Sequence, residues 1–112
     1  TAGAPISVAL GVKAEAQGQG SLSIGSLAYT KNTGDVAVGV NSAATGGDSI
    51  AIGAGSDLKG TAYVQSGASA SKKGASASGA NSISIGTNTA ATGTNAVVVG
   101  TQSTASNLAV AV

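Results

Sequence analysis

The sequence lacks cysteine, histidine, methionine, tryptophan and phenylalanine, and it contains one proline. Without cysteine, the chain can form neither a disulfide framework nor a cysteine-ligated zinc site. Without histidine, most nucleophile–base pairs and transition-metal sites lose one of their members. The composition therefore predicts that the protein is not an enzyme and that it uses no cofactor or metal.

Charged residues are also scarce: they make up 8% of the 112 residues, against roughly 25% in an ordinary soluble domain. A formal net charge of +1 gives no reason to expect a nucleic-acid partner. With 42% hydrophobic residues, disorder driven by charge is excluded. No apolar run approaches the roughly 18 residues that a membrane-spanning helix needs.

A four-residue pattern of large apolar, small, large apolar and glycine recurs along the chain, with valine in the small place of the last copy. It ends at Gly11, Gly25, Gly39, Gly53, Gly86 and Gly100. These glycines are 14 residues apart, except that 33 residues separate Gly53 from Gly86. Residues 64–67 (Val-Gln-Ser-Gly) fit a degenerate unit in this gap. The sequence thus predicts one domain, 1–112, with a degenerate repeat and an insertion around 64–82.

A second column lies seven residues after each unit's glycine and holds only glycine or asparagine. Its members are Gly18, Asn32, Gly46, Gly60, Gly74, Gly93 and Asn107. Both residue types tolerate positive φ angles. The column therefore predicts a chain reversal in every unit.

The alternation of large and small residues before each glycine is typical of a β-strand. A 14-residue unit then holds two short strands and two turns, and successive units stack about 4.8 Å apart. This is an all-β parallel β-solenoid. Its coil is too narrow for two populated apolar faces, so the surplus face is expected to pack against other copies.

Three stretches are similar to the Asn/Ser-Val-Ala-Ile-Gly-x-x-Ser motif in the heads of trimeric autotransporter adhesins, the type represented by the Yersinia adhesin head. They lie at 35–42, 48–56 and 81–89, and the resemblance covers residues 6–112. The resemblance implies a left-handed parallel β-roll that assembles as a homotrimer. It also implies a passenger domain on the bacterial cell surface, anchored in the outer membrane through a domain not present here.

The function implied by the resemblance is cell adhesion in virulence, by multivalent binding to host extracellular matrix proteins, cell-surface receptors or glycans. The alternative is a purely structural or ice-binding β-solenoid, which needs a regular threonine array. Thr87 and Thr101 share a column, as do Thr33, Thr61 and Thr94, but other residues interrupt both columns. A solenoid enzyme would need clustered acidic and basic side chains, which the sequence does not suggest.

Candidate ligand-binding residues come from the same columns. Lys31, Lys59 and Lys73 lie six residues after their unit's glycine, which predicts a basic stripe, and Lys72 is adjacent in the insertion. Tyr29 and Tyr63 are the only aromatic residues. The stripe favours an acidic partner, although surface lysines also serve solubility and block unwanted sheet pairing. Asp35 and Asp48 precede strands, where capping of a turn is expected.

Overall fold

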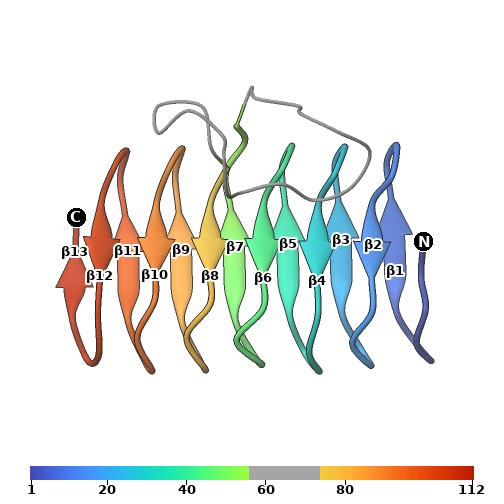
Figure 1. The fold of residues 1–112 in the computed structure, drawn as a ribbon, viewed down its shortest axis with the longest axis horizontal. Helices are drawn as coiled ribbons and strands as arrows, with labels where there is room; N and C mark the ends of the chain where they lie inside the picture. Colours follow the sequence, from blue (N-terminus) through green and yellow to red (C-terminus); the bar gives the residue numbers. More distant parts are fainter. Residues whose placement is uncertain (56–73) are drawn as a thin grey trace.

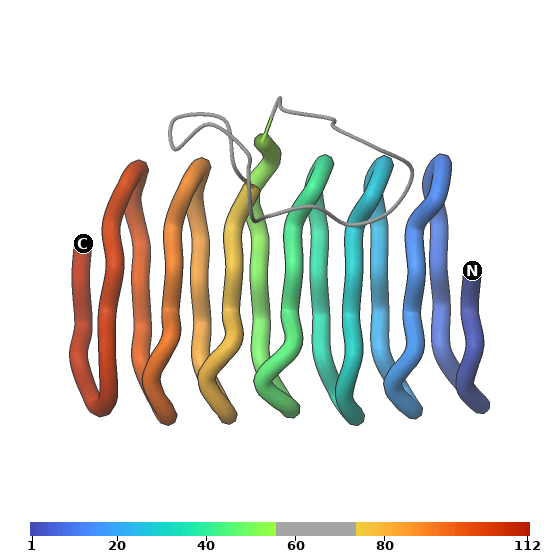
Figure 2. Tube along the Cα trace, viewed as in Figure 1, coloured from blue at the N-terminus to red at the C-terminus, as the bar shows by residue number. Residues whose placement is uncertain are grey.

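The computed structural model describes residues 1–55 and 74–112, and the fold is that of a β-solenoid. The chain winds into stacked coils, and its two termini lie at opposite ends of the stack (Figure 1). Each full coil crosses from one sheet to the other and back, as the tube in Figure 2 shows. The described residues contain strands and turns but no helix.

Two parallel sheets form the walls of the solenoid, and every described strand pairs with the equivalent strand of the next coil. The seven-stranded sheet contains β1 (Val8–Leu10), β3 (Leu22–Ile24), β5 (Val36–Val38), β7 (Ile50–Ile52), β9 (Ile83–Ile85), β11 (Val97–Val99) and β13 (Val110–Ala111). The six-stranded sheet contains β2 (Glu15–Ala16), β4 (Tyr29–Thr30), β6 (Ala43–Ala44), β8 (Ser76–Ala77), β10 (Ala90–Ala91) and β12 (Thr104–Ala105).

The 14-residue period sets the register of these sheets. Val8 pairs with Leu22, and Leu22 pairs with Val36. The amide of Leu22 donates to the carbonyl of Asp35 at 2.9 Å, and the same bond recurs one coil later from Val36 to Ser49 at 2.8 Å. The predicted all-β parallel solenoid of 14-residue coils is confirmed.

The core between the sheets is built almost entirely from alanine and serine. In the seven-stranded sheet the central residue of each strand points inward, and Ala37, Ala51 and Ser84 are fully buried there. Hydroxyl groups inside the core satisfy one another or the backbone. Ser23 Oγ donates to Thr30 Oγ1 at 3.1 Å, and Ser84 Oγ donates to a second threonine hydroxyl at 2.8 Å. The small residues therefore face inward and the large ones face outward.

The irregular region departs from the prediction. Residues 64–67, the predicted degenerate unit, lie outside the described residues, but β7 pairs directly with β9 and β6 pairs directly with β8. No further strand therefore separates these neighbours in either sheet. The extra residues between Gly53 and Gly86 belong to one long coil rather than to an additional paired unit.

This register also corrects the predicted turn column at Gly74. The residue stacked between Gly46 and Gly93 is Gly79, whereas Gly74 lies against the backbone of Asn41. Gly60 lies outside the described residues. The prediction failed because it counted seven residues from Gly67, which is not in register with the other motif glycines.

The turn column keeps small residues for a different reason from the one predicted. Gly18, Gly46 and Gly93 do not have positive φ. A Cβ at any of these three glycines would overlap the backbone of the next coil. Asn32 occupies the same column and joins the coils instead, since its Nδ2 donates to the carbonyl of Thr45 at 2.6 Å.

The motif glycines, in contrast, need both space and a positive φ. Gly25 has a φ of +123°, and a Cβ added there would lie 2.7 Å from the carbonyl carbon of Gly39. The other motif glycines in the described coils also have positive φ. A glycine at this position lets the coils stay at sheet spacing while the chain leaves the strand.

We expect Gly25→Ala to destabilise the β-roll by at least about 2 kcal/mol, because the substitution adds backbone strain and a clash between coils. Denaturant unfolding at one fixed protein concentration measures the loss. The matched control is Gly3→Ala, where the added Cβ lies 3.9 Å from its nearest neighbour, the carbonyl oxygen of Ala16. Equal unfolding midpoints for the two variants would contradict this account of the motif.

Candidate functional site: two opposite faces of the roll

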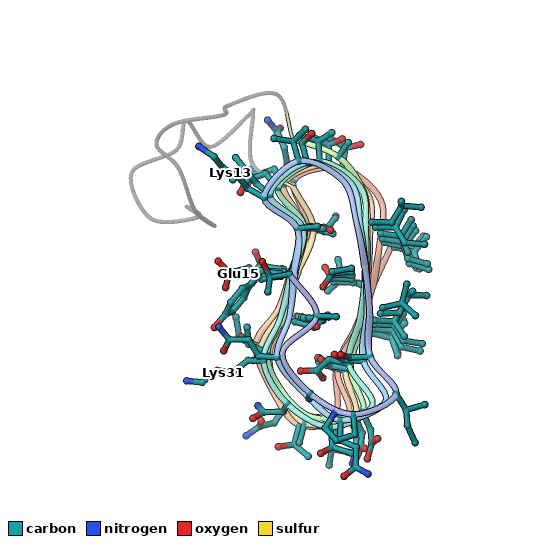
Figure 3. The ribbon with its side chains drawn as sticks, turned by 90° about the vertical axis from the view of Figure 1, so that its right-hand side faces the viewer. Lys13, Glu15 and Lys31 are labelled. Carbon is teal, nitrogen blue, oxygen red and sulfur yellow. The ribbon has the colours of Figure 1, made fainter. Side chains whose placement is uncertain are left out.

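The outer surface of the seven-stranded sheet, here called the apolar face, carries two columns of large aliphatic side chains. Its members are Val8, Leu10, Leu22, Ile24, Val36, Val38, Ile50, Ile52, Ile83, Ile85, Val97, Val99 and Val110. In the single chain Ile52, Ile85 and Val99 remain 39%, 37% and 38% exposed. Figure 3 shows these columns as side chains without oxygen or nitrogen along one flank. A continuous apolar surface of this kind marks an interaction face.

The outer surface of the six-stranded sheet, here called the polar face, has the opposite character. Its members are Glu15, Gln17, Tyr29, Lys31, Ala43, Thr45, Ser76, Ser78, Ala90, Thr92, Thr104 and Ser106. Lys13, Glu15 and Lys31 project from the flank opposite the apolar columns (Figure 3). The sequence did not settle which face would bind, whereas the structure separates an apolar face from a polar one.

The predicted basic stripe is not present in the described coils. Lys31 is exposed, and in the described coils its column continues as Gln17, Thr45, Ser78, Thr92 and Ser106. The place that the prediction gave to Lys73 belongs to Ser78, because β8 pairs with β6 through Ala77 and Ala44. Lys59, Lys72, Lys73 and Tyr63 lie outside the described residues.

Tyr29 belongs to a small hydrogen-bonded group on the polar face. Its hydroxyl donates to Gln17 Oε1 at 3.3 Å, and Gln17 Nε2 donates to Glu15 Oε2 at 3.0 Å. These three residues are called the Tyr29 cluster below. The analysis of the sequence did not single out Glu15 and Gln17. Their signal was the 14-residue period itself, which pairs Glu15 with Tyr29 in neighbouring strands.

Charge is distributed unevenly along the stack. The charged side chains of the described residues are Lys13, Glu15, Lys31, Asp35 and Asp48, and residues 74–112 contain none. The carboxyl-terminal coils present hydroxyl and methyl groups on the polar face instead. A partner that recognises charge therefore meets it, among the described coils, only in the amino-terminal ones.

Comparison with known families adds a decisive observation. The sequence model of the YadA head domain repeat matches residues 7–28, 31–56, 73–89 and 91–108, which together make up most of the chain. The chain belongs to this family. Its members are the heads of trimeric autotransporter adhesins, so the family is of adhesin type, as the resemblance implied. Neither the curated proteins nor the solved structures gave a match.

One head repeat carries a buried carboxylate, and the structure shows its role. Asp35 is completely buried, in the column where Ser21, Ser49 and Ser82 stand in other repeats. Its Oδ2 accepts from the Asn32 amide at 2.8 Å. Its Oδ1 accepts from the Gly47 amide at 2.9 Å, the Ser49 amide at 3.1 Å and Ser49 Oγ at 2.7 Å. Asp35 thus caps its own turn, as expected, and also joins two repeats.

The head repeats show neither a metal-ligand cluster nor a continuous threonine array among the described residues. No group of three or more potential metal-ligating side chains occurs in 1–55 and 74–112. Thr87 and Thr101 stack on Ala54 and Val40, and Thr33 and Thr94 are separated in their column by Gly47 and Ala80. No described helix is long and apolar enough to cross a membrane.

We expect Asp35→Ala to destabilise the head repeats by at least about 2 kcal/mol, because three amides lose a shared acceptor in a buried turn. Thermal or denaturant unfolding measures this. Asp48→Asn is the control, since Asp48 is exposed and asparagine tolerates its φ of +49°. The control should change stability by less than about 0.5 kcal/mol. An Asp35→Ala protein as stable as the control would contradict the capping role.

Proposed function

We propose that this chain forms part of the surface-exposed passenger head of a trimeric autotransporter adhesin. In this proposal the head attaches a bacterium to host extracellular matrix proteins, cell-surface receptors or glycans. The observation that carries the proposal is the separation of the two faces, since one outer surface is aliphatic and the opposite one is polar. The first suits assembly between copies, and the second stays available to a ligand.

The apolar face supports assembly as a homotrimer. Aliphatic side chains occupy both outward positions of nearly every strand in the seven-stranded sheet, so the surface is continuous along the stack. The interior cannot take these side chains, because it is filled by alanine and serine. Only another protein surface removes the remaining aliphatic area from water, at about 25 cal/mol per Å² buried. The number of copies, three, comes from the family.

Trimerisation through the apolar face directs three polar faces outward. Each copy then offers the same candidate residues, with Tyr29 and Lys31 among the described ones. Weak contacts made three times over on a rigid support give firm attachment through high effective concentration. A stiff stack of hydrogen-bonded coils suits this task, because little conformational entropy is lost when the ligand binds.

The first test is assembly. We expect the wild-type chain to be a trimer by light scattering and Ile52→Asp to be a folded monomer or dimer, since the aspartate would be buried without a partner in the interface. The wild-type side chain is 39% exposed in the single chain, so a folded coil can hold the substitution. Ser78→Asp places the same charge on the polar face and should leave the trimer intact. A trimeric Ile52→Asp protein would contradict the assignment of the faces.

The second test is attachment. Purified wild-type protein should bind surfaces coated with extracellular matrix proteins or cultured host cells, and assembly-defective Ile52→Asp should bind much less because avidity is lost. Binding is measured by retention under washing. A trimer that binds none of these surfaces would refute the adhesive role while leaving the assembly intact.

A further inference from the structure

We infer that the Tyr29 cluster, together with Lys13 and Lys31, is a binding site for a carboxylated glycan, a polysaccharide built with uronic acid units. The inference rests on the proposed adhesive function and names a ligand class for one part of the polar face. The site lies on the amino-terminal coils, on β2, β4 and the turn before β2.

The first step is the location of positive charge. Lys13 and Lys31 are the only described cations apart from the amino terminus, both are exposed, and both project from the polar flank (Figure 3). Neither forms an ion pair with a described residue. The described coils from residue 74 onward offer no charge at all. An anionic ligand that reaches the described part of the polar face is therefore drawn to the amino-terminal coils.

The second step is the pattern of charge across this site. Glu15 lies between the two lysines in the view along the stack (Figure 3). Its carboxylate is engaged on one oxygen by Gln17 Nε2 at 3.0 Å and has further acceptor capacity. The complementary ligand presents negative charges flanking neutral hydrogen-bond donors. Uronate polysaccharides have this arrangement, because carboxylates alternate with hydroxyl-bearing units along the chain.

The third step is the aromatic ring. Tyr29 is half-buried beside Glu15, and its hydroxyl is held by Gln17 at 3.3 Å. A ring restrained in this way offers an apolar surface at low entropic cost, next to groups that bind hydroxyls. A sugar ring matches this combination, with an apolar face and polar edges. A purely acidic peptide uses the lysines but places its carboxylates beside Glu15, which is repulsive.

The test uses the assembled protein and a short ligand that occupies one copy at a time, so that avidity does not enter. The probe is a hyaluronan tetrasaccharide, and titration calorimetry measures its affinity. Two further probes are the same tetrasaccharide with its carboxylates reduced to alcohols, and tetraglutamate. The variants are Lys31→Gln and, as a matched control, Thr92→Gln, which makes the same residue in the same column three coils further along.

We expect the wild-type protein and Thr92→Gln to bind the tetrasaccharide equally, and Lys31→Gln to bind it about two- to fivefold more weakly, as an exposed ion pair dictates. Added salt should weaken binding to the wild-type protein and have less effect on Lys31→Gln. The reduced tetrasaccharide and tetraglutamate should both bind more weakly than the native probe. Unchanged trimer mass for Lys31→Gln excludes a loss through misassembly.

Three results would overturn the inference: no tetrasaccharide binding to the wild-type trimer, equal binding by Lys31→Gln, or tetraglutamate binding as well as the tetrasaccharide. The last result would assign the site to acidic protein segments. Attachment to matrix-coated surfaces is measured on the same preparations. If attachment persists without glycan binding, the glycan site falls and the adhesive function stands; if attachment is absent too, the proposed function falls with it.

Discussion

The stacking of equal coils through backbone hydrogen bonds is the constraint on which the rest of the structure depends. Each coil must return to its starting point within 14 residues so that its amides meet the carbonyls of the next coil. A circuit this short encloses a space that alanine and serine fill. Large side chains are consequently placed on the outside, where their burial depends on other copies. Core composition, the two faces and the proposed assembly all follow from the length of the coil.

The sequence predicted the parallel solenoid because a strict period turns sequence distance directly into stacking distance. It did not establish which side of the strand faces inward, since alternation separates two faces without naming the interior. Side-chain volume decides that point: Ala37 and Ala51 are fully buried, while Ile52 remains partly exposed. The glycine of the turn column was predicted for the wrong reason. Close approach of backbones, as at Gly18 against Asn32, leaves no trace in a single coil's sequence.

The candidate site was predicted less well than the fold, and the cause lies in the long coil between Gly53 and Gly86. Counting from residues 64–67 shifted Gly74 and Lys73 into columns that belong to Gly79 and Ser78. Where the period was unbroken, the placement held: Lys31 is exposed on the polar face and Asp35 caps its turn. The Tyr29 cluster escaped notice because Glu15 and Gln17 acquire meaning only through their neighbours in the next coil.

The division of the faces also explains where recognition can vary without damage to the fold. The inward column of the six-stranded sheet is alanine in every described coil except at Thr30, because stacking tolerates little change there. The outward column of the apolar face is restricted to valine, isoleucine and leucine. The outward column of the polar face, in contrast, runs from Glu15 and Tyr29 to Ala43, Ser76, Ala90 and Thr104. Substitutions in this column touch neither the core nor the proposed interface, so a head of this design can change its ligand while its coils remain the same.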